Sequence, residues 1–204
     1  MSDLSPPPDA GPPAAPATPR RVLAQQWVSA DGFAAGPTGE SEIFAAVDDF
    51  SDSEQHNMAL LTGVDVVLLG RRTYELFVAV WPEADGEPMA ELVNSVPKVV
   101  CSTTLTRAPW GRFDPAAVVP DGEGHVRDLT ASAGGDVLIW GSLELMRSLL
   151  RAGLLTDIEL FVAPVGLGAG TPLLAPEGPY QLQLRDGDIH RSGTVRLHYA
   201  VTYP

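Results

Sequence analysis

Residues 134–174 read GGDVLIWGSLELMRSLLRAGLLTDIELFVAPVGLGAGTPLL, and this stretch decides the fold. After a glycine turn, the apolar run 137–140 predicts a buried strand. Gly141 and Ser142 break that strand, and a helix is predicted at once from apolar residues at helical spacing: Leu143, Met146, Leu149 and Leu150. A second strand, 157–162, follows. Because strand–helix–strand units normally lay their strands parallel in one sheet, the stretch predicts an α/β fold.

The rest of the chain continues this alternation and then closes on a hairpin. Ser51 and Glu54 have the spacing of a capping box at the start of a helix. We expect strands at 21–28, 64–69, 98–101 and 118–119, and helices at 51–61, from Thr73 onward, at 89–94 and at 126–133. The segments 180–189 and 194–203 alternate in strand fashion around a turn and predict a terminal antiparallel hairpin. The sequence therefore predicts an α/β domain with a mostly parallel central sheet and antiparallel strands at one edge.

The chain of 204 residues is long enough for one domain with a full core, which we assign to residues 20–204. Residues 1–19 hold seven of the 19 prolines and no aromatic residue. Such a composition buries too little apolar surface to offset the entropy of ordering, so a disordered tail is predicted. The tail lacks the pattern of a secretory signal, and we find no run long enough to cross a membrane.

The formal net charge is −13, and two of these charges, Asp3 and Asp9, lie in a tail without a base, which leaves −11 for residues 20–204. An acidic domain argues against binding to nucleic acid or to an anionic membrane. Cys101 is the only cysteine, which excludes an intramolecular disulfide and suits a cytoplasmic protein. The four histidines show no ligand spacing with one another or with Cys101, so no metal site is expected.

Three predicted strands end in residues of similar character. These ends are Gly70-Arg71-Arg72-Thr73, Ser102-Thr103 and Gly141-Ser142. Ligands of open α/β sheets bind outside the carboxyl ends of the parallel strands. Two arginines, several hydroxyls and two helix N-termini would meet there, a set that suits a dinucleotide. The alternative is that the arginines are solvated and the hydroxyls cap helices.

Two loops complete the set of candidate residues. Gly166–Gly170 is rich in glycine, but no helix follows it, so it does not fit the dinucleotide-binding fingerprint. Asp31 is the only carboxylate on the loop after the first strand. It could bind ring N–H groups of a heterocycle or relay a proton, or it could simply form a turn with Gly32.

Several of these motifs together resemble one family. They are Ser29-Ala30-Asp31-Gly32, Leu69-Gly70-Arg71-Arg72-Thr73-Tyr74-Glu75, Ser102-Thr103-Thr104-Leu105, Gly134-Gly135-Asp136 through Gly141-Ser142, and Pro164 with Leu167-Gly168-Ala169-Gly170. Their order and spacing resemble the dihydrofolate reductase-like proteins related to the reductase half of the bacterial bifunctional riboflavin-biosynthesis deaminase-reductase. The resemblance covers the chain from Arg21 to the C-terminus.

The resemblance implies a dihydrofolate reductase-like three-layer fold and an NADPH-dependent reductase that transfers a hydride to a small pteridine- or pyrimidine-like heterocycle. It implies that Arg71 and Thr73 meet cofactor phosphates, beside Gly70 and Arg72. It places Ser102 and Thr103 by the adenosine 2′-phosphate, and Gly141, Ser142 and Leu143 at the pyrophosphate. It places Trp140 near the nicotinamide, and Asp31 at the reacting site as the catalytic residue.

One departure and two alternatives stay open. Many relatives carry an arginine where this chain has Thr103, which bears on the choice between NADPH and NADH. A non-catalytic nucleotide-binding protein would need the same phosphate contacts, and a flavin- or deazaflavin-binding protein is the third reading. The resemblance also implies a homodimer, and the apolar terminal hairpin needs its edge covered or charged.

Overall fold

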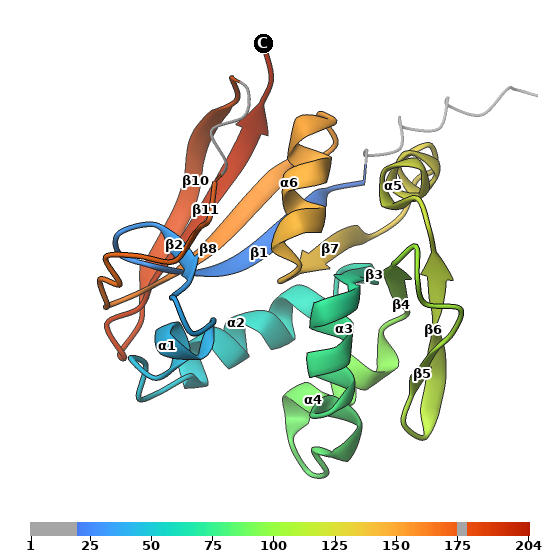
Figure 1. Ribbon diagram of the computed structural model, residues 1–204, viewed down its shortest axis with the longest axis horizontal. Helices are drawn as coiled ribbons and strands as arrows, with labels where there is room; N and C mark the ends of the chain where they lie inside the picture. The colour runs from blue at the N-terminus through green and yellow to red at the C-terminus, as the bar shows by residue number, and fades with distance from the viewer. Residues whose placement is uncertain (1–19, 175–178) are drawn as a thin grey trace, which may run out of the picture.

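The computed structural model describes residues 20–174 and 179–204, and a nine-stranded sheet runs through the molecule (Figure 1). The strand order is β10-β11-β8-β1-β7-β3-β4-β6-β5. The strands are β1 (Val22–Ser29), β3 (Val64–Gly70), β4 (Lys98–Cys101), β5 (Ala108–Trp110), β6 (Phe113–Val119), β7 (Asp136–Trp140), β8 (Asp157–Ala163), β10 (Gln181–Ile189) and β11 (Val195–Thr202).

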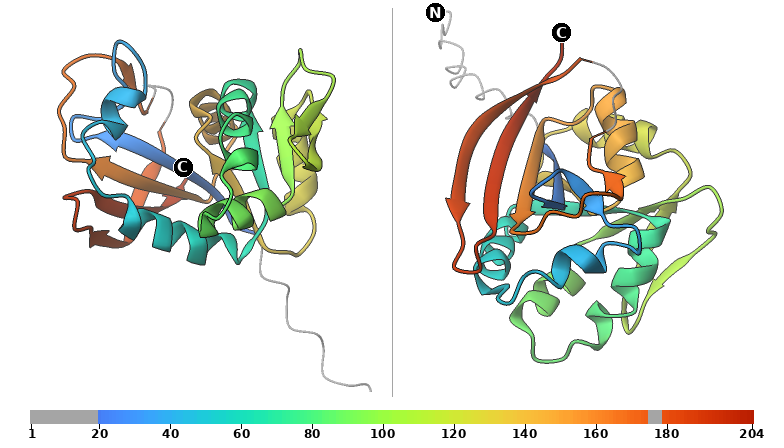
Figure 2. Two further views of the ribbon diagram at one scale, coloured as in Figure 1. Left: turned by 90° about the horizontal axis from the view of Figure 1, so that it is seen from below. Right: turned by 60° about the vertical axis from the view of Figure 1, so that its left-hand side comes forward.

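The six strands from β8 to β6 are parallel, and antiparallel strands close both edges of the sheet. The hairpin β10–β11 forms one edge, as Figure 2 shows, and β5 forms the other. The predicted α/β fold with a mostly parallel sheet and a C-terminal hairpin is confirmed. The antiparallel β5 was not predicted, because its apolar residues are too few to show a period.

The first strand lies between the two strands of the stretch that decides the fold. Ala24 of β1 pairs with Ile139 of β7 on one side and with Ile158 of β8 on the other. The helix α6 (Leu143–Arg151) connects β7 and β8 across β1. The two strands are parallel, as predicted, and they are two positions apart in the sheet.

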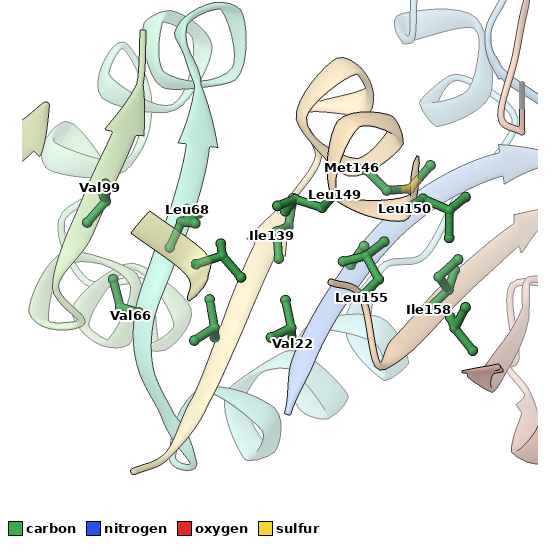
Figure 3. Packing of buried hydrophobic residues seen from close by; sticks show 14 of the residues in the cluster. Val22, Val66, Leu68, Val99, Ile139, Met146, Leu149, Leu150, Leu155 and Ile158 are labelled. Atoms are coloured by element: carbon green, nitrogen blue, oxygen red, sulfur yellow. The ribbon is translucent and has the colours of Figure 1, made fainter. Parts of the chain in front are cut away.

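Helices cover both faces of the sheet and give three layers. Val22 and Ala24 belong to a core cluster that α6 and α5 (Gly122–Thr130) cover, and Figure 3 shows Met146, Leu149 and Leu150 of α6 in it. Leu23 points to the opposite cluster because side chains alternate along a strand. That cluster lies under α2 (Ser51–Leu61), α3 (Arg71–Val78) and α4 (Pro88–Ser95).

Short elements lie above the carboxyl ends of β1 and β8. They are α1 (Ser41–Phe44) and a small sheet of β2 (Phe33–Ala35) and β9 (Thr171–Pro172), whereas the 3-10 helix η1 (Trp81–Glu83) contacts α3 and α4. Ile43 of α1 is fully buried in a third cluster with Val47 and Ala163. This cluster fixes the loop after β1 over the end of the sheet.

The capping box predicted at Ser51 and Glu54 is wrong, although α2 spans the predicted residues. Phe50 occupies the N-cap position and makes no capping hydrogen bond, whereas Asp49 Oδ1 accepts from the Ser51 N–H at 2.9 Å. The hydroxyl of Ser51 accepts a hydrogen bond from Arg191, and that of Ser53 donates to the carbonyl of Phe50. Tertiary contacts have taken the groups that a capping box would use.

The prediction of a disordered tail falls on residues 1–19, which lie outside the described residues. Among residues 20–174 and 179–204, no helix is both long and apolar enough to cross a lipid bilayer.

Candidate functional site

Two adjoining cavities open at the carboxyl ends of the parallel strands. The first cavity has a volume of about 500 Å³ and the second of about 700 Å³. Gln26 at β1, Thr73 at α3 and Gly141 after β7 line both of them. The cavities therefore meet where strands β1, β7 and β3 end, which is where ligands of open α/β sheets bind.

The strand ends at the second cavity are joined by the hydroxyl of Ser142. The Gly70 N–H donates to Ser142 Oγ at 2.7 Å, and Ser142 Oγ donates to Thr73 Oγ1 at 2.9 Å. These bonds join the end of β3 and the start of α3 to the segment between β7 and α6. The ends of β3 and β7, which were predicted to lie close together, are thus in direct contact.

The backbone at Gly141 and Ser142 has positive φ angles of 58° and 61°. A side chain at position 141 would meet Thr73 Cγ2 at 3.2 Å, so glycine suits both the conformation and the space. The turn presents the first N–H groups of α6 at residues that line the second cavity, among them Leu143. Such groups have no acceptor within the helix and attract anions.

The two arginines at the start of α3 line the second cavity but differ in their contacts. Arg71 Nε donates to Glu75 Oε1 at 2.7 Å, and Arg71 Nη1 donates to Thr104 Oγ1 at 3.1 Å. Arg72 has no ion pair within the part of the chain that the structure describes. Arg72 is therefore the arginine whose charge is available to an anionic ligand.

Seven of the ten residues predicted to bind a cofactor line the second cavity: Gly70, Arg71, Arg72, Thr73, Gly141, Ser142 and Leu143. Trp140 lines the first cavity instead. Ser102 and Thr103 line neither of the two. The Ser102 hydroxyl accepts the N–H groups of Thr104 and Leu105 and so shapes the loop after β4, where Thr104 contacts Arg71.

Asp31 lies outside both cavities, and its contacts favour a structural role. Its carboxylate accepts hydrogen bonds from Ser29 Oγ at 2.6 Å, Leu167 N–H at 3.0 Å and Gly168 N–H at 2.7 Å. These bonds, that from Ser29 most of all, lower the pKa of Asp31 to about 2. A carboxylate that is ionised near neutral pH and already bonded on both oxygens holds the glycine-rich loop in place, and this geometry gives no support to the predicted catalytic role.

Six aromatic side chains line the first cavity. They are Trp27, Phe44, Phe50, Phe77, Trp81 and Trp140. The rings of Trp81 and Trp140 stack with centroids 6.4 Å apart, and Phe77 meets Trp140 edge to face at 5.5 Å. Walls of this kind suit a flat apolar or heterocyclic ligand.

The polar groups deep in the first cavity are amides. Gln25 Nε2 donates to Asn57 Oδ1 at 2.8 Å and to Glu159 Oε1 at 2.7 Å. Because both partners are acceptors, the amide orientation of Gln25 is fixed. Its Oε1 is buried and has no hydrogen-bond partner among the described residues.

A buried ion-pair network stands behind these amides. Burial alone would raise the pKa of Glu159, but hydrogen bonds from His56 and Gln25, the attraction of His56 and a hydrogen bond from Arg196 outweigh it and lower the pKa to about 2. Arg196 Nη1 donates to Glu159 Oε2 at 2.8 Å. Glu159 is thus ionised, and it holds Gln25 in one orientation at the wall of the cavity.

The sequence reasoning missed most of the first cavity, whose lining comes from β1, β2, α1, α2, α3, η1, α4 and β7 and from the loops beside them. One feature of the sequence could have indicated it. Gln25 and Gln26 interrupt a strand that is otherwise apolar from Val22 to Val28, and both are buried. Buried amides in a central strand need partners and therefore mark a polar site.

Comparison with known proteins shows which family this chain matches. The family model of the RibD C-terminal domain matches residues 20–197. The protein YyaP of Bacillus subtilis is 25% identical over 187 residues, which cover 88% of this chain and 94% of that protein.

Solved structures of low sequence identity share the fold. A putative riboflavin biosynthesis protein from Shewanella sp. PV-4 is 21% identical, with a TM-score of 0.73 over 89% of this chain and 99% of the other. The Thermotoga maritima protein described as a diaminohydroxyphosphoribosylaminopyrimidine deaminase/5-amino-6-(5-phosphoribosylamino)uracil reductase is 13% identical, with a TM-score of 0.59. That match covers 90% of this chain and 57% of the Thermotoga chain. The fold is the dihydrofolate reductase-like fold of these proteins.

Proposed function

Because this chain belongs to the family of the RibD C-terminal domain, whose members typically use NAD(P)H, we propose that it is an NADPH-dependent reductase of a small conjugated heterocycle. The observation that carries the proposal is the shared lining of the two cavities at Gln26, Thr73 and Gly141. A dinucleotide in the second cavity and a flat substrate in the first would meet at these residues.

The second cavity suits the phosphates of a dinucleotide. It combines the cation of Arg72, the N-terminal ends of α3 and α6, and a glycine at position 141 that leaves room for close approach. In a domain of net charge −11, such local positive groups are needed to attract an anion. Bound NADPH would supply the hydride from its nicotinamide ring.

The protein's own contribution is to orient the substrate and to exclude water. The aromatic wall would hold a planar ring, and Gln26 would fix its position at the junction of the cavities. Gln26 Nε2 donates to the Gly141 carbonyl at 2.5 Å, which leaves Gln26 Oε1 as a free acceptor within the described part of the chain. Near-attack geometry of this kind accounts for much of the rate enhancement in bimolecular reactions.

One observation favours the alternative of a non-catalytic nucleotide-binding protein. Glu40 and Glu54 are the only ionisable residues among the described residues that line the first cavity, and both are exposed. A proton for the reduced substrate would have to come from one of them or from water. A binding protein needs no proton donor.

Two measurements test the proposal in turn. Titration with NADPH and with NADH, followed by tryptophan fluorescence, should show saturable binding. Oxidation of bound NADPH should then accelerate with at least one member of a panel of pterins, pyrimidines and quinonoid acceptors. If NADPH binds but is not oxidised with any member of the panel, the result would favour a non-catalytic nucleotide-binding protein. If neither NADPH nor NADH binds, the reductase and the nucleotide-binding protein would both be ruled out.

A further inference from the structure

The first cavity is unusual in its charge. None of its lining residues is a lysine, arginine or histidine, and two of them are carboxylates: Glu54, which lines only this cavity, and Glu40, which also lines the second. Residues 1–19 and 175–178, which the structure does not describe, contain no lysine, arginine or histidine. An anionic group placed in this cavity would find no side chain of opposite charge among the described residues that line it.

Basic residues on neighbouring elements do not line the first cavity. Arg191 reaches the start of α2, one turn before Glu54, but it donates to Asp52 Oδ1 at 2.9 Å and to Ser51 Oγ at 2.8 Å. His56 faces the buried Glu159, with 3.0 Å between Nε2 and Oε1. Arg72 lines the second cavity, where the cofactor phosphates are proposed to lie.

The polar groups that remain in the first cavity are neutral. Asn57 Oδ1 accepts from Gln25, so the Nδ2 branch of Asn57 is left as a donor without a partner among residues 20–174 and 179–204. Gln25 Oε1, buried without a partner, and Gln26 Oε1 are acceptors. Donors and acceptors of this kind match the N–H and C=O groups at the edge of an uncharged heterocycle.

We infer that the first cavity takes an uncharged or cationic planar heterocycle without a phosphate group. This inference rests on the proposed function of the two cavities. The inference separates this chain from the Thermotoga protein, whose described substrate, 5-amino-6-(5-phosphoribosylamino)uracil, carries a phosphate. A buried or half-buried phosphate without a cation is strongly disfavoured, and two nearby carboxylates add repulsion.

The test uses pairs of ligands that differ only by the phosphate. The pairs are 5-amino-6-(5-phosphoribosylamino)uracil with its dephosphorylated form, and flavin mononucleotide with riboflavin. Binding to the full chain is followed by quenching of tryptophan, since Trp27, Trp81 and Trp140 line the cavity, and by equilibrium dialysis. All titrations are made without nicotinamide nucleotide and are repeated with the Arg72→Ala variant, so that a phosphate held by the vacant second cavity is recognised.

In at least one pair, the form without phosphate should bind at least about tenfold more tightly at low ionic strength. The ratio should fall as salt is added, because Glu40 and Glu54 are exposed and their field is screened. Equal or tighter binding of the phosphorylated form, or no binding of either form in both pairs, would overturn the inference.

A charge-reversal variant with a matched control tests whether the charge of the first cavity causes the preference for ligands without a phosphate. Glu54→Lys places a cation at the cavity and should shrink the ratio several-fold. Glu91→Lys makes the same change of charge on an exposed residue of α4 that does not line the cavity, and should leave the ratio unchanged. An unchanged ratio in Glu54→Lys would overturn the charge argument.

Failure of this inference is distinguishable from failure of the proposed function. The ligand pairs report on the first cavity in the absence of nucleotide, and NADPH titration reports on the second. A chain that binds NADPH but prefers phosphorylated ligands contradicts only the inference. A chain that discriminates against phosphate but binds no NADPH contradicts only the cofactor assignment.

Discussion

At the scale of single residues, Arg71 and Arg72 separate two roles that the sequence could not distinguish. Both follow β3 and both line the second cavity. Arg71 is occupied by Glu75 and Thr104, whereas Arg72 has no ion pair in the described structure. The exposed pair Arg71–Glu75 is worth little to stability, so Arg71 can exchange its partner for a phosphate at small cost.

Replacement of Arg72 by alanine should weaken NADPH binding by roughly 10- to 150-fold, since a hydrogen bond to an ionised partner contributes about 1.5–3 kcal/mol. Arg71→Ala should fall within the same range or below it. Isothermal titration against NADPH and NADH shows which arginine meets the 2′-phosphate, because its loss affects NADPH more. Unchanged affinities in the double variant, with an intact circular dichroism spectrum, would remove the cofactor assignment.

The candidate site shows why prediction from residues is partial. The grouping of residues at the second cavity was predictable because Gly70 to Thr73 and Gly141 to Leu143 are contiguous and follow apolar strands. Most of the first cavity was not, because its residues come from eight elements that only the tertiary fold brings together. The catalytic role of Asp31 is implied by the family resemblance and stays a prediction, and the sequence alone does not show that Leu167 and Gly168 donate to its carboxylate.

At the scale of elements, the turn between β7 and α6 should be sensitive to a single methyl group. Gly141→Ala must place alanine at a φ of 58° with its Cβ 3.2 Å from Thr73 Cγ2. Gly153→Ala is the matched control, with a φ of 68° and no atom within 4 Å. We expect a loss of about 1–2 kcal/mol in the control, from conformation alone, and more in Gly141→Ala.

Denaturant unfolding measures both variants, and NADPH titration follows. Only Gly141→Ala should also lose nucleotide affinity, since Gly153 lies at the far end of α6. Equal losses of stability with unchanged affinity in both variants would show that the turn tolerates a side chain and does not approach the nucleotide.

The ion-pair network that joins β8 and β11 makes the stability of the folded protein depend on pH in the acidic range. The pKa of Glu159 is about 2 in the folded chain and 4.5 in a free side chain. Because the folded pKa is depressed, the stabilisation is present above about pH 4.5 and is lost as the pH falls towards 2. The shift corresponds to about 3 kcal/mol.

Glu159→Gln should therefore unfold with a weaker dependence on pH between 4.5 and 2 than the wild type. Arg196→Met leaves Glu159 buried without its closest cation and should cost about 3–5 kcal/mol at pH 7. Urea unfolding over a pH series checks both. Identical pH profiles of wild type and Glu159→Gln would assign the acid sensitivity to other carboxylates.

At the scale of the whole molecule, the outer edge of the sheet predicts self-association. β10 is an edge strand, and it exposes 55% of Leu184 and 82% of Ile189. Unpaired edges with apolar residues are normally covered or charged. We expect a homodimer that uses this edge, with twice the chain mass by light scattering at micromolar concentration.

Leu184→Lys places a charge on that edge and should yield a monomer, whereas Ala59→Lys, on the exposed side of α2, should leave the dimer intact. A wild-type monomer at micromolar concentration would refute the dimer. A dimer that persists in Leu184→Lys would place the contact on another face.

The position of β1 between β7 and β8 has a consequence for how the chain reaches its native state. β1 is made first by the ribosome, and its two neighbours come from residues 136–163. Its hydrogen bonds and the amides of Gln25 and Gln26 must wait until more than a hundred further residues have been synthesised. Contacts so distant along the chain slow folding, so a nascent chain that stalls before residue 136 leaves an apolar strand exposed and becomes a target for chaperones.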